Sequence, residues 1–265
     1  MAAHKLHITT AIIMVSLVIV LFLLFIMQQR ALKPLHQFTS HEISQTILNE
    51  VNCKKTKTQP PEHMLVVARY NEDISWLSTH LGDFPSVVYV KNDTTALHNI
   101  EGNAGNEAPL YLRFILDNYY KLPKYTAFLH GHRSSWHMPD IVPLLRKLDW
   151  GKLGYMPLNI ERFATIEPPN PEYYMIEWSW PTWFEKEMGP LPPSFNRYCC
   201  AQFVVDRDRI LKHPIEFYQN LFDFLQSGSM DNFYSSRIFE HTWHYIFGDP
   251  FNVTRSLFNF TDITK

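Results

Sequence analysis

The stretch Phe128-Leu129-His130-Gly131-His132-Arg133-Ser134-Ser135-Trp136-His137 is the part of the chain from which the rest is interpreted. It continues the apolar run 125–129, which has the length of a buried strand. Ligands of open α/β sheets bind beyond the carboxyl ends of the strands, where this cluster of imidazoles, a guanidinium and an indole would lie. His130 and His132 point to the same side if the strand persists, because side chains alternate with a period of two. The cluster is therefore a candidate ligand or metal site. The alternative is a strand end whose histidines hydrogen-bond to the backbone.

Apolar runs at 64–69, 86–91 and 199–205 are further strand candidates beside 125–130. The first is followed by a polar turn and an amphipathic helix, the order of a βα unit. A helix starting at Ala108 carries apolar residues at the spacing of a core-facing stripe. The sequence therefore predicts an α/β fold, a single three-layer domain over residues 63–250 with a mainly parallel sheet.

Polar residues before the helices predict where the helices begin. Asn71 and Asn106 are candidate N-caps, and Asp206 can cap a helix that starts at Arg207. Residues 161–197 are rich in proline and tryptophan and match no regular element. We expect an ordered insertion there that covers the site, with its tryptophans either stacked on a ligand or buried.

Composition excludes some classes of protein. The chain has 265 residues, 46% of them hydrophobic and 19% charged, which is typical of an ordered globular protein. A net charge of −2 without a clustered basic face gives no sign of nucleic-acid binding. Three cysteines, Cys53, Cys199 and Cys200, allow one bridge from Cys53 to either of the adjacent pair.

The amino-terminal region predicts a membrane anchor. Residues 8–27 carry no charge, and their length matches a bilayer core of roughly 30 Å. The run ends in Met27-Gln28-Gln29-Arg30, without the small-residue cleavage site of a signal peptide. We therefore expect a short tail at 1–7, an uncleaved signal anchor, a stalk at 28–62 and a tail at 251–265.

The orientation of this anchor rests on two opposing signals. One lysine precedes the span and two cationic residues follow it, which weakly favours a cytoplasmic domain. Glycosylation sequons at Asn92, Asn252 and Asn259 favour a lumenal domain instead. Because long domains translocate largely regardless of charge, we expect a single-pass protein of the Golgi or endoplasmic reticulum with its domain in the lumen.

Candidate site residues fall in three parts of the chain. Arg69 ends a predicted strand, where a guanidinium can bind phosphate or carboxylate bidentately. In the central loop, His130 and His132 are candidate ligands of a divalent metal. Arg133, Trp136 and His137 beside them, with His132 itself, are candidate ligand-binding residues.

The last predicted helix, 234–247, carries the third group. Glu240 and His244 are four residues apart and share a face, so we expect them to be catalytic. Trp243 between them offers a surface for stacking a ligand. Alternatively, Trp243 belongs to the buried stripe of this helix and the polar groups face solvent.

Ordered motifs along the chain resemble the family called domain of unknown function 3431 (DUF3431). They are Arg69-Tyr70-Asn71-Glu72-Asp73 with Trp76, Asn106-Glu107-Ala108, Phe128 to His132 with Trp136-His137, Gln202 to Val205, and Glu240-x-x-Trp243-His244. The resemblance covers about residues 64–248. It implies one site made of Arg69, His130, His132, His137, Glu240 and His244. The family is also loosely similar to GT-A glycosyltransferases, with His-Gly-His where those enzymes have Asp-x-Asp.

Three functions are compatible with these patterns. The first is a membrane-anchored, lumenal glycosyltransferase-like enzyme that acts on a sugar nucleotide or glycan. The second is a metal-dependent hydrolase that holds zinc with His130, His132, His137 and His244. The third is a non-catalytic carbohydrate-binding or scaffold protein.

Overall fold

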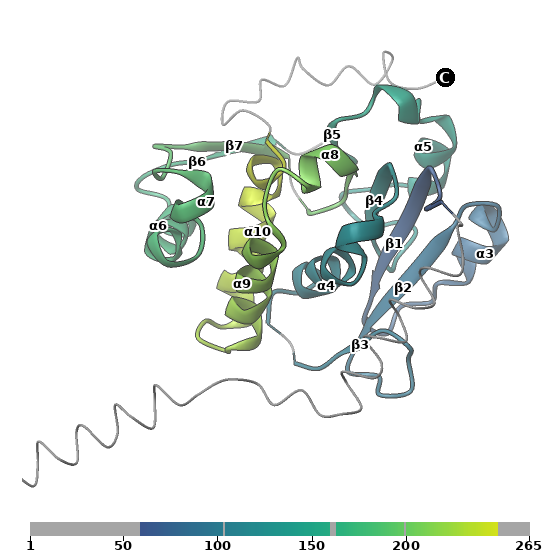
Figure 1. The fold of residues 1–265 in the computed structure, drawn as a ribbon, viewed down its shortest axis with the longest axis horizontal. Coiled ribbons are helices and arrows are strands. Elements are labelled where there is room, and N and C mark those ends of the chain that lie inside the picture. Colours follow the sequence, from purple (N-terminus) through teal and green to yellow (C-terminus); the bar gives the residue numbers. More distant parts are fainter. Residues whose placement is uncertain (1–58, 103, 160–162, 199, 249–265) are drawn as a thin grey trace, which may run out of the picture. The chain divides into compact units, whose positions relative to one another are not determined.

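The structure, a computed structural model, describes residues 59–102, 104–159, 163–198 and 200–248 (Figure 1). All of these residues except Gln59 lie in one compact unit, Pro60–Lys265. Within the described ranges no helix combines the length and hydrophobicity needed to cross a bilayer. The predicted anchor, most of the predicted stalk and the sequons at Asn252 and Asn259 lie outside the described residues.

One six-stranded sheet organises the domain, in the order β3-β2-β1-β4-β8-β5. Its members are β1 (His63–Arg69), β2 (Ser86–Lys91), β3 (Asn99–Ile100), β4 (Tyr125–His130), β5 (Tyr155–Pro157) and β8 (Phe203–Asp206). Strands β3, β2, β1 and β4 are parallel neighbours, whereas β8 runs antiparallel to both β4 and β5. The predicted α/β fold with a mainly parallel sheet is confirmed, and the predicted 199–205 strand is the antiparallel member.

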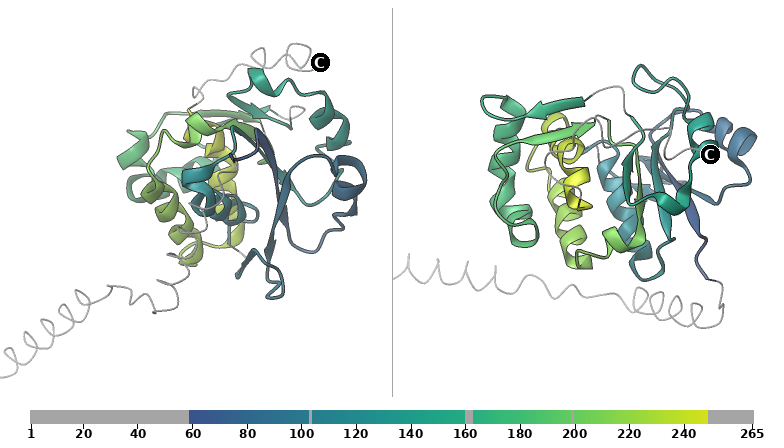
Figure 2. Two further views of the ribbon diagram at one scale, coloured as in Figure 1. Left: turned by 45° about the vertical axis from the view of Figure 1, so that its right-hand side comes forward. Right: turned by 90° about the horizontal axis from the view of Figure 1, so that it is seen from above.

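Helices cover both faces of this sheet (Figures 1 and 2). One face carries α3 (Ser75–Leu81) and α5 (Ile141–Lys147). The other carries α4 (Ala108–Asn118), α8 (Arg207–Ile210), α9 (Ile215–Gln226) and α10 (Asn232–Ile246). Short 3-10 helices at Tyr119–Lys121 and Trp150–Lys152 complete the connections.

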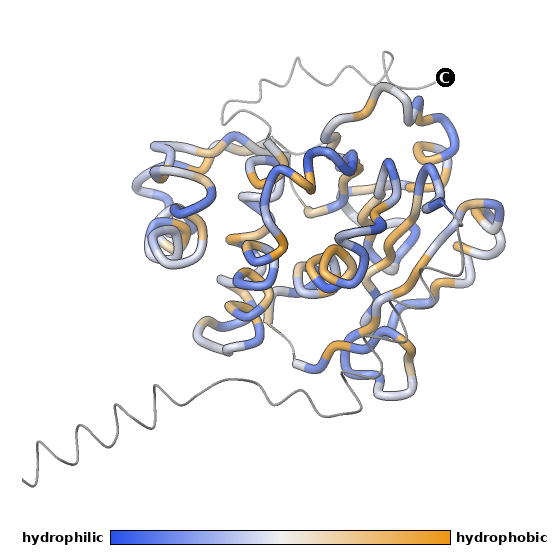
Figure 3. The backbone as a smooth tube through the Cα atoms, viewed as in Figure 1, coloured by the Kyte–Doolittle hydropathy of each residue, from blue (hydrophilic) through white to orange (hydrophobic). Residues whose placement is uncertain are grey.

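Strand β1 shows why a helical layer forms on each side. Leu65 and Val67 belong to the core under α3 and α5, whereas Val66 and Ala68 belong to the larger core under α4 and α10. Successive side chains of a strand point to opposite faces, so a continuous apolar run needs a cover on both. Figure 3 shows hydrophobic residues along the central strands and on turns of α4.

Two helices begin differently from the prediction. The N-cap of α3 is Ile74, and Asp73 rather than Asn71 accepts from Ser75 N, at 2.9 Å. Helix α4 has Glu107 as its N-cap, without a side-chain cap bond. Asn106 takes a positive φ of 47° in the turn before it, and amides tolerate that conformation better than most side chains. Asp206 caps α8 as predicted, accepting from Arg209 N.

The proline- and tryptophan-rich segment is ordered but does not cover the site. It forms β6 (Phe163–Ile166), α6 (Pro171–Trp183), α7 (Glu185–Met188) and β7 (Phe195–Tyr198), with β6 and β7 paired in a second sheet. Helix α6 packs against α10 and α9, and no described residue of this segment lines the pocket at the strand ends. Trp180 is buried against Phe184 and Phe195, so burial rather than ligand stacking explains this tryptophan.

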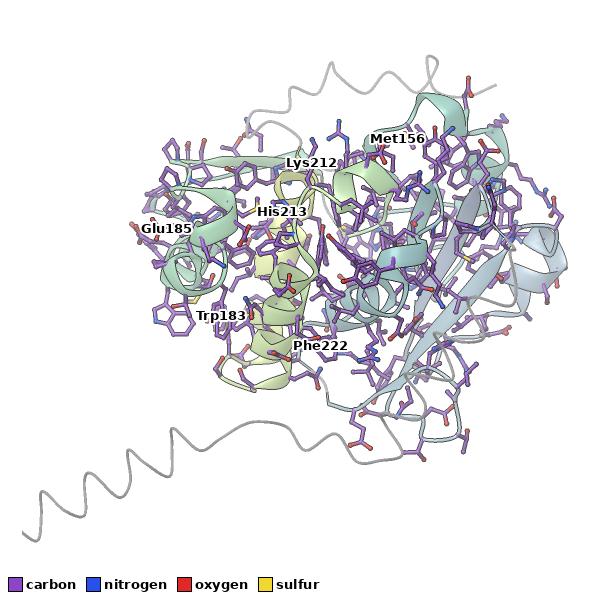
Figure 4. All side chains as sticks on the ribbon, viewed as in Figure 1. Met156, Trp183, Glu185, Lys212, His213 and Phe222 are labelled. Carbon is purple, nitrogen blue, oxygen red and sulfur yellow. The ribbon has the colours of Figure 1, made fainter. Side chains whose placement is uncertain are left out.

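His213, labelled in Figure 4, lies between α8 and α9, and we expect its partly buried imidazole to make the domain less stable in acid. Its Nε2 lies 2.9 Å from the Ile246 carbonyl oxygen, and burial lowers the pKa of the imidazole below 6.5. A lowered pKa means that the unfolded chain takes up this proton more readily, so stability is lost as pH falls below about 6.5. We expect a lower melting temperature at pH 5.5 than at 7.5, and a smaller difference in His213→Gln. An unchanged difference in the variant would contradict this role.

Candidate metal centre and pocket

The register of the sheet brings three strands to one edge of the domain. Ala68 of β1 pairs with Tyr89 of β2 and with His130 of β4. Because paired residues share a face, the His130 side chain emerges on the α4 side, next to Ala68. Lys91 lies two residues beyond Tyr89 and so emerges on the same side. The small Ala68 side chain between them leaves room above the sheet.

Three histidines meet at this edge. One ring nitrogen from each of His130, His132 and His137 lies within 4.8 Å of the other two. Their ring centroids are 5.1–5.9 Å apart. The Nε2 atoms of His130 and His132 are shielded from solvent and have no hydrogen-bond partner among the described residues. Three imidazoles placed in this way can serve as ligands of one metal ion.

Burial keeps the imidazoles of His130 and His132 neutral. Burial, with the neighbouring His132 and His137 adding to it, lowers the pKa of His130 to about 3. Burial also lowers the pKa of His132, against the opposing charge of Glu72. Metal ions bind the neutral imidazole, so both groups are in the ligating form at neutral pH.

Gly131 explains why the motif is His-Gly-His. A Cβ at this position would lie 2.8 Å from Glu72 Oε2. That carboxylate oxygen accepts from Tyr70 N and Asn71 N at 2.7 and 3.1 Å, which fixes the turn after β1. Trp76 Nε1 donates to the Gly131 carbonyl oxygen at 2.8 Å. The glycine thus lets the turns after β1 and β4 approach each other closely.

A buried amide pair supports His130 from behind. Gln202 Oε1 accepts from His130 N at 3.0 Å, and Gln202 Nε2 donates to Asn159 Oδ1 at 3.3 Å. Asn159 Nδ2 in turn donates to the carbonyl oxygen of Cys200, at 3.0 Å. Cys200 is disulfide-bonded, and the chain's other cysteines lie outside the described residues. The end of β4 is therefore tied through two amides to a crosslinked turn.

Gln202→Leu is expected to lower the free energy of unfolding by about 2–6 kcal/mol. The change leaves His130 N and Asn159 Oδ1 without partners in the interior, each at a cost of about 1–3 kcal/mol. Urea unfolding followed by fluorescence measures the loss. Gln219→Leu, on the exposed face of α9, is the matched control and should change stability by less than about 0.5 kcal/mol. Equal effects of the two substitutions would contradict the supporting role of Gln202.

The histidines form one side of a pocket of about 460 Å³. Its lining residues come from the ends of β1, β2 and β4 and from the starts of α4 and α10. They are Ala68, Arg69, Tyr70, Glu72, Lys91, Asn106, Glu107, Leu110, His130, His132, His137 and Asn232. The starts of the two helices are joined by paired amides, because Asn106 N donates to Asn232 Oδ1 and Asn232 Nδ2 donates to Asn106 Oδ1.

Glu107, which is partly buried, and Lys91, which is buried, are two charged residues of this pocket whose pKa values burial shifts. Glu107 Oε2 lies 4.0 Å from His130 Nε2. Burial, reinforced by the charge of Glu240, raises the pKa of Glu107 to about 7. Burial lowers the pKa of Lys91 to about 8. The pocket therefore holds a carboxyl group that can both give and take a proton near neutral pH, beside the neutral imidazoles of His130 and His132.

Comparison with models of protein families matches residues 65–256 to the family described as Protein of unknown function (DUF3431). The chain belongs to the DUF3431 family. No curated protein and no solved structure matches it. The function proposed below for this DUF3431 domain therefore rests on its fold and on the geometry of its pocket.

The structure brings together only part of the predicted site. Arg69, His130, His132 and His137 all line the pocket. Arg133 does not line it, because its guanidinium binds Asp140 and His80 beside α5. Trp136 lies next to His137, 68% exposed, with the two rings perpendicular at 4.9 Å.

The predicted catalytic residues of α10 lie on later turns of that helix than the residue that lines the pocket. Glu240 Oε1 accepts from Cys200 N and Oε2 from Arg237 Nη1, each at 3.1 Å. Trp243 is buried and stacks on Phe247, and His244 is also buried. None of Glu240, Trp243 and His244 is among the pocket-lining residues. Helix α10 reaches the pocket with its first residue, Asn232, and Glu240 lies about 12 Å further along the axis.

Sequence reasoning missed Glu107, Lys91, Glu72 and Asn232 as site residues. Lys91 is the last residue of the predicted strand 86–91 and directly follows its apolar part. Arg69 and His130 end their predicted strands in the same way, so the position of Lys91 could have marked it as a site residue. Glu107 follows Asn106 in a motif quoted above for the family resemblance. Nothing in the local sequence distinguishes Asn232 from an ordinary residue at a helix start.

Proposed function

We propose that this DUF3431 domain is a divalent-metal-dependent hydrolase whose metal ion is bound by His130, His132 and His137. The supporting observation is the convergence of these three imidazoles, within 4.8 Å, in a pocket that also contains Glu107. Catalytic zinc sites use three protein ligands and keep a fourth position for water or substrate. Among the described residues no fourth His, Cys, Asp or Glu joins the cluster, which favours an open site.

The residues present fit such an ion. The shielded Nε2 atoms of His130 and His132 lack hydrogen bonds to the described residues, and a metal bond would satisfy them. His244, expected as a fourth ligand, is not part of the cluster.

The proton chemistry falls to Glu107. A divalent ion held by His130, His132 and His137 would supply the activation of a water molecule or the polarisation of a substrate oxygen. Glu107, 4.0 Å from His130 Nε2, can take a proton at that position and return it to the leaving group. A general acid–base works best when its pKa is near the working pH, and the pKa of Glu107 is about 7. Arg69 at the end of β1 binds and orients the substrate.

The test combines metal analysis with a survey of activity. Purified full-length protein in detergent should contain about one zinc or other divalent ion per chain. Its hydrolysis of a panel of phosphate esters, sugar nucleotides and glycosides should be lost on chelation and restored by the metal. Glu107→Gln should retain the metal and lower turnover by roughly 10²–10⁴-fold. A chain that binds no divalent ion would refute the proposal.

A glycosyltransferase-like activity is the second candidate. Tyr70, which lines the pocket, is 55% exposed, so a sugar ring could stack on it, and Arg69 could hold the donor phosphates. Transfer of a sugar from a nucleotide donor to an acceptor, faster than hydrolysis of that donor, would favour this candidate. Binding of glycans without any turnover would favour a carbohydrate-binding or scaffold role.

We also propose that the enzyme is anchored by residues 8–27 with its domain in the lumen of the Golgi or endoplasmic reticulum. In support, Asn92 of the first sequon is exposed in the loop after β2. Expression in eukaryotic cells should give a band that shifts on glycosidase treatment, and the shift should shrink in Asn92→Gln. A carboxy-terminal tag that is cut by protease added to the cytosolic side would refute the lumenal orientation.

A further inference from the structure

Lys91 carries a charge that the protein itself does not neutralise. Its side chain is only 4% exposed and lines the pocket. Lys91 Nζ donates to the Ala104 carbonyl oxygen at 3.0 Å. No carboxylate of the described residues lies within 4.0 Å of this ammonium group. Glu107, the nearest acid by its electrostatic influence, shares the pocket but makes no ion pair with it.

A buried ammonium group of this kind calls for a partner. Lysine has three N–H donors, and the contact with Ala104 uses one of them. Burying a charge is costly unless it is paired, so buried lysines usually have an anion beside them. The remaining donors of Lys91 belong to a side chain on the pocket wall, where a ligand in the pocket can accept from them.

Arg69 offers a second cation on the adjacent strand. Arg69 pairs with Val90 in the β1–β2 register, so its side chain leaves the sheet on the face opposite to Lys91, and it reaches the same pocket at the end of the strand. Its Nε donates to the Glu72 carbonyl oxygen at 2.9 Å, which aligns the guanidinium. Among the described residues no carboxylate lies within 4.0 Å of this guanidinium group either.

We propose that the substrate of this site carries a phosphoryl group, which is bound between Lys91 and Arg69. This inference rests on the hydrolase function proposed above and names its substrate class. An arginine fork together with a lysine point charge matches the several oxygens of a phosphate better than a single carboxylate. Lys91 and His130 start on strands that flank β1, about 10 Å apart. The phosphoryl group therefore serves for binding and is not the group that is hydrolysed at the histidines. The rest of the substrate extends from it past Ala68 to the three histidines.

The experiment measures binding of inorganic phosphate by calorimetry, with acetate as the competing anion. Metal-loaded full-length protein is compared with Lys91→Met, Arg69→Met and the matched control Lys121→Met on the 3-10 helix after α4. Lys91→Met and Arg69→Met should each weaken phosphate binding by at least 10-fold and leave metal content unchanged. Lys121→Met should bind phosphate as the unchanged protein does. Phosphate can also bind directly to a metal ion, so the series is repeated in protein that carries His132→Ala. In that background Lys91→Met should still weaken phosphate binding.

The outcomes separate the two proposals. The phosphoryl subsite is refuted if the protein binds metal but no phosphate. It is also refuted if Lys91→Met and Arg69→Met keep the phosphate affinity within twofold. Neither result contradicts the proposed metal site. Tighter binding of acetate than of phosphate also refutes the phosphoryl assignment. If the protein binds no metal but still binds phosphate through Lys91 and Arg69, the metal-dependent hydrolase is refuted instead. If Lys91→Met does not fold, Arg69→Met and Lys91→Arg decide, because Lys91→Arg keeps the charge and should retain phosphate binding.

Discussion

His132→Ala is expected to lower the affinity of the DUF3431 domain for Zn²⁺ by about 100-fold or more. Structural zinc sites bind with about 10–16 kcal/mol from four ligands, or roughly 3 kcal/mol for each ligand. A loss of that size corresponds to about a hundredfold in affinity. Because His132 Nε2 makes no hydrogen bond to the described residues, its removal should cost little stability. Competition with a chromophoric chelator measures the zinc affinity, and thermal unfolding checks the fold.

The matched control for this variant is His98→Ala. His98 stacks on Tyr89 at 4.5 Å and belongs to a different surface, so its removal should leave zinc affinity unchanged. His130→Ala should resemble His132→Ala, because both rings belong to the same cluster. Retention of full zinc affinity by both pocket variants would show that the three histidines do not hold a metal ion, and the hydrolase proposal would fall with them.

Strand ends were the part of the site that sequence could predict. Arg69 and His130 each close an apolar run, and parallel neighbouring strands bring such ends to one edge. The same logic placed His132 and His137 in the loop beyond that edge. The sheet itself followed from continuous apolar runs, which require a cover on both faces. The antiparallel direction of β8 was not predictable, because direction depends on the path of the chain between β5 and β8.

The contribution of α10 could not be read from its sequence. Glu240 and His244 share a helical face, but which neighbour that face meets depends on how the helix packs. In the structure Glu240 holds Cys200 N and Arg237, while Arg237 and His241 reach Glu172 of the inserted helix α6. This stretch of α10 therefore ties the insertion to the Cys200 turn. Glu107 and Lys91 gain their altered pKa values only from tertiary burial, which no local pattern reveals.

Phe203→Ala is expected to lower the free energy of unfolding by about 3–5 kcal/mol. Phe203 of β8 is buried and meets five aromatic rings at 5.2–5.9 Å, those of Tyr111, Phe128, Tyr155, Trp243 and Phe247. These rings come from α4, β4, β5 and the end of α10, so a single side chain joins both helices to the sheet. Removal of such a ring loses its burial and leaves a cavity that close packing cannot fill. Since domains of this kind are stable by only about 5–15 kcal/mol, the variant should unfold at markedly lower temperature and denaturant concentration.

We expect Phe203→Ala also to disturb the position of His130 at the metal site, because β8 lies beside β4. Gln202, which supports His130, directly precedes Phe203, and Phe203 pairs with Phe128, two residues before His130. Phe203→Leu keeps most of the apolar volume and should lose less stability than Phe203→Ala. Phe233→Ala removes a ring that is 55% exposed and should change stability by less than about 1 kcal/mol. Equal denaturation midpoints for Phe203→Ala and Phe233→Ala would show that the aromatic cluster does not hold α4 and α10 on the sheet. Other contacts would then have to keep the pocket open between the first turns of these two helices.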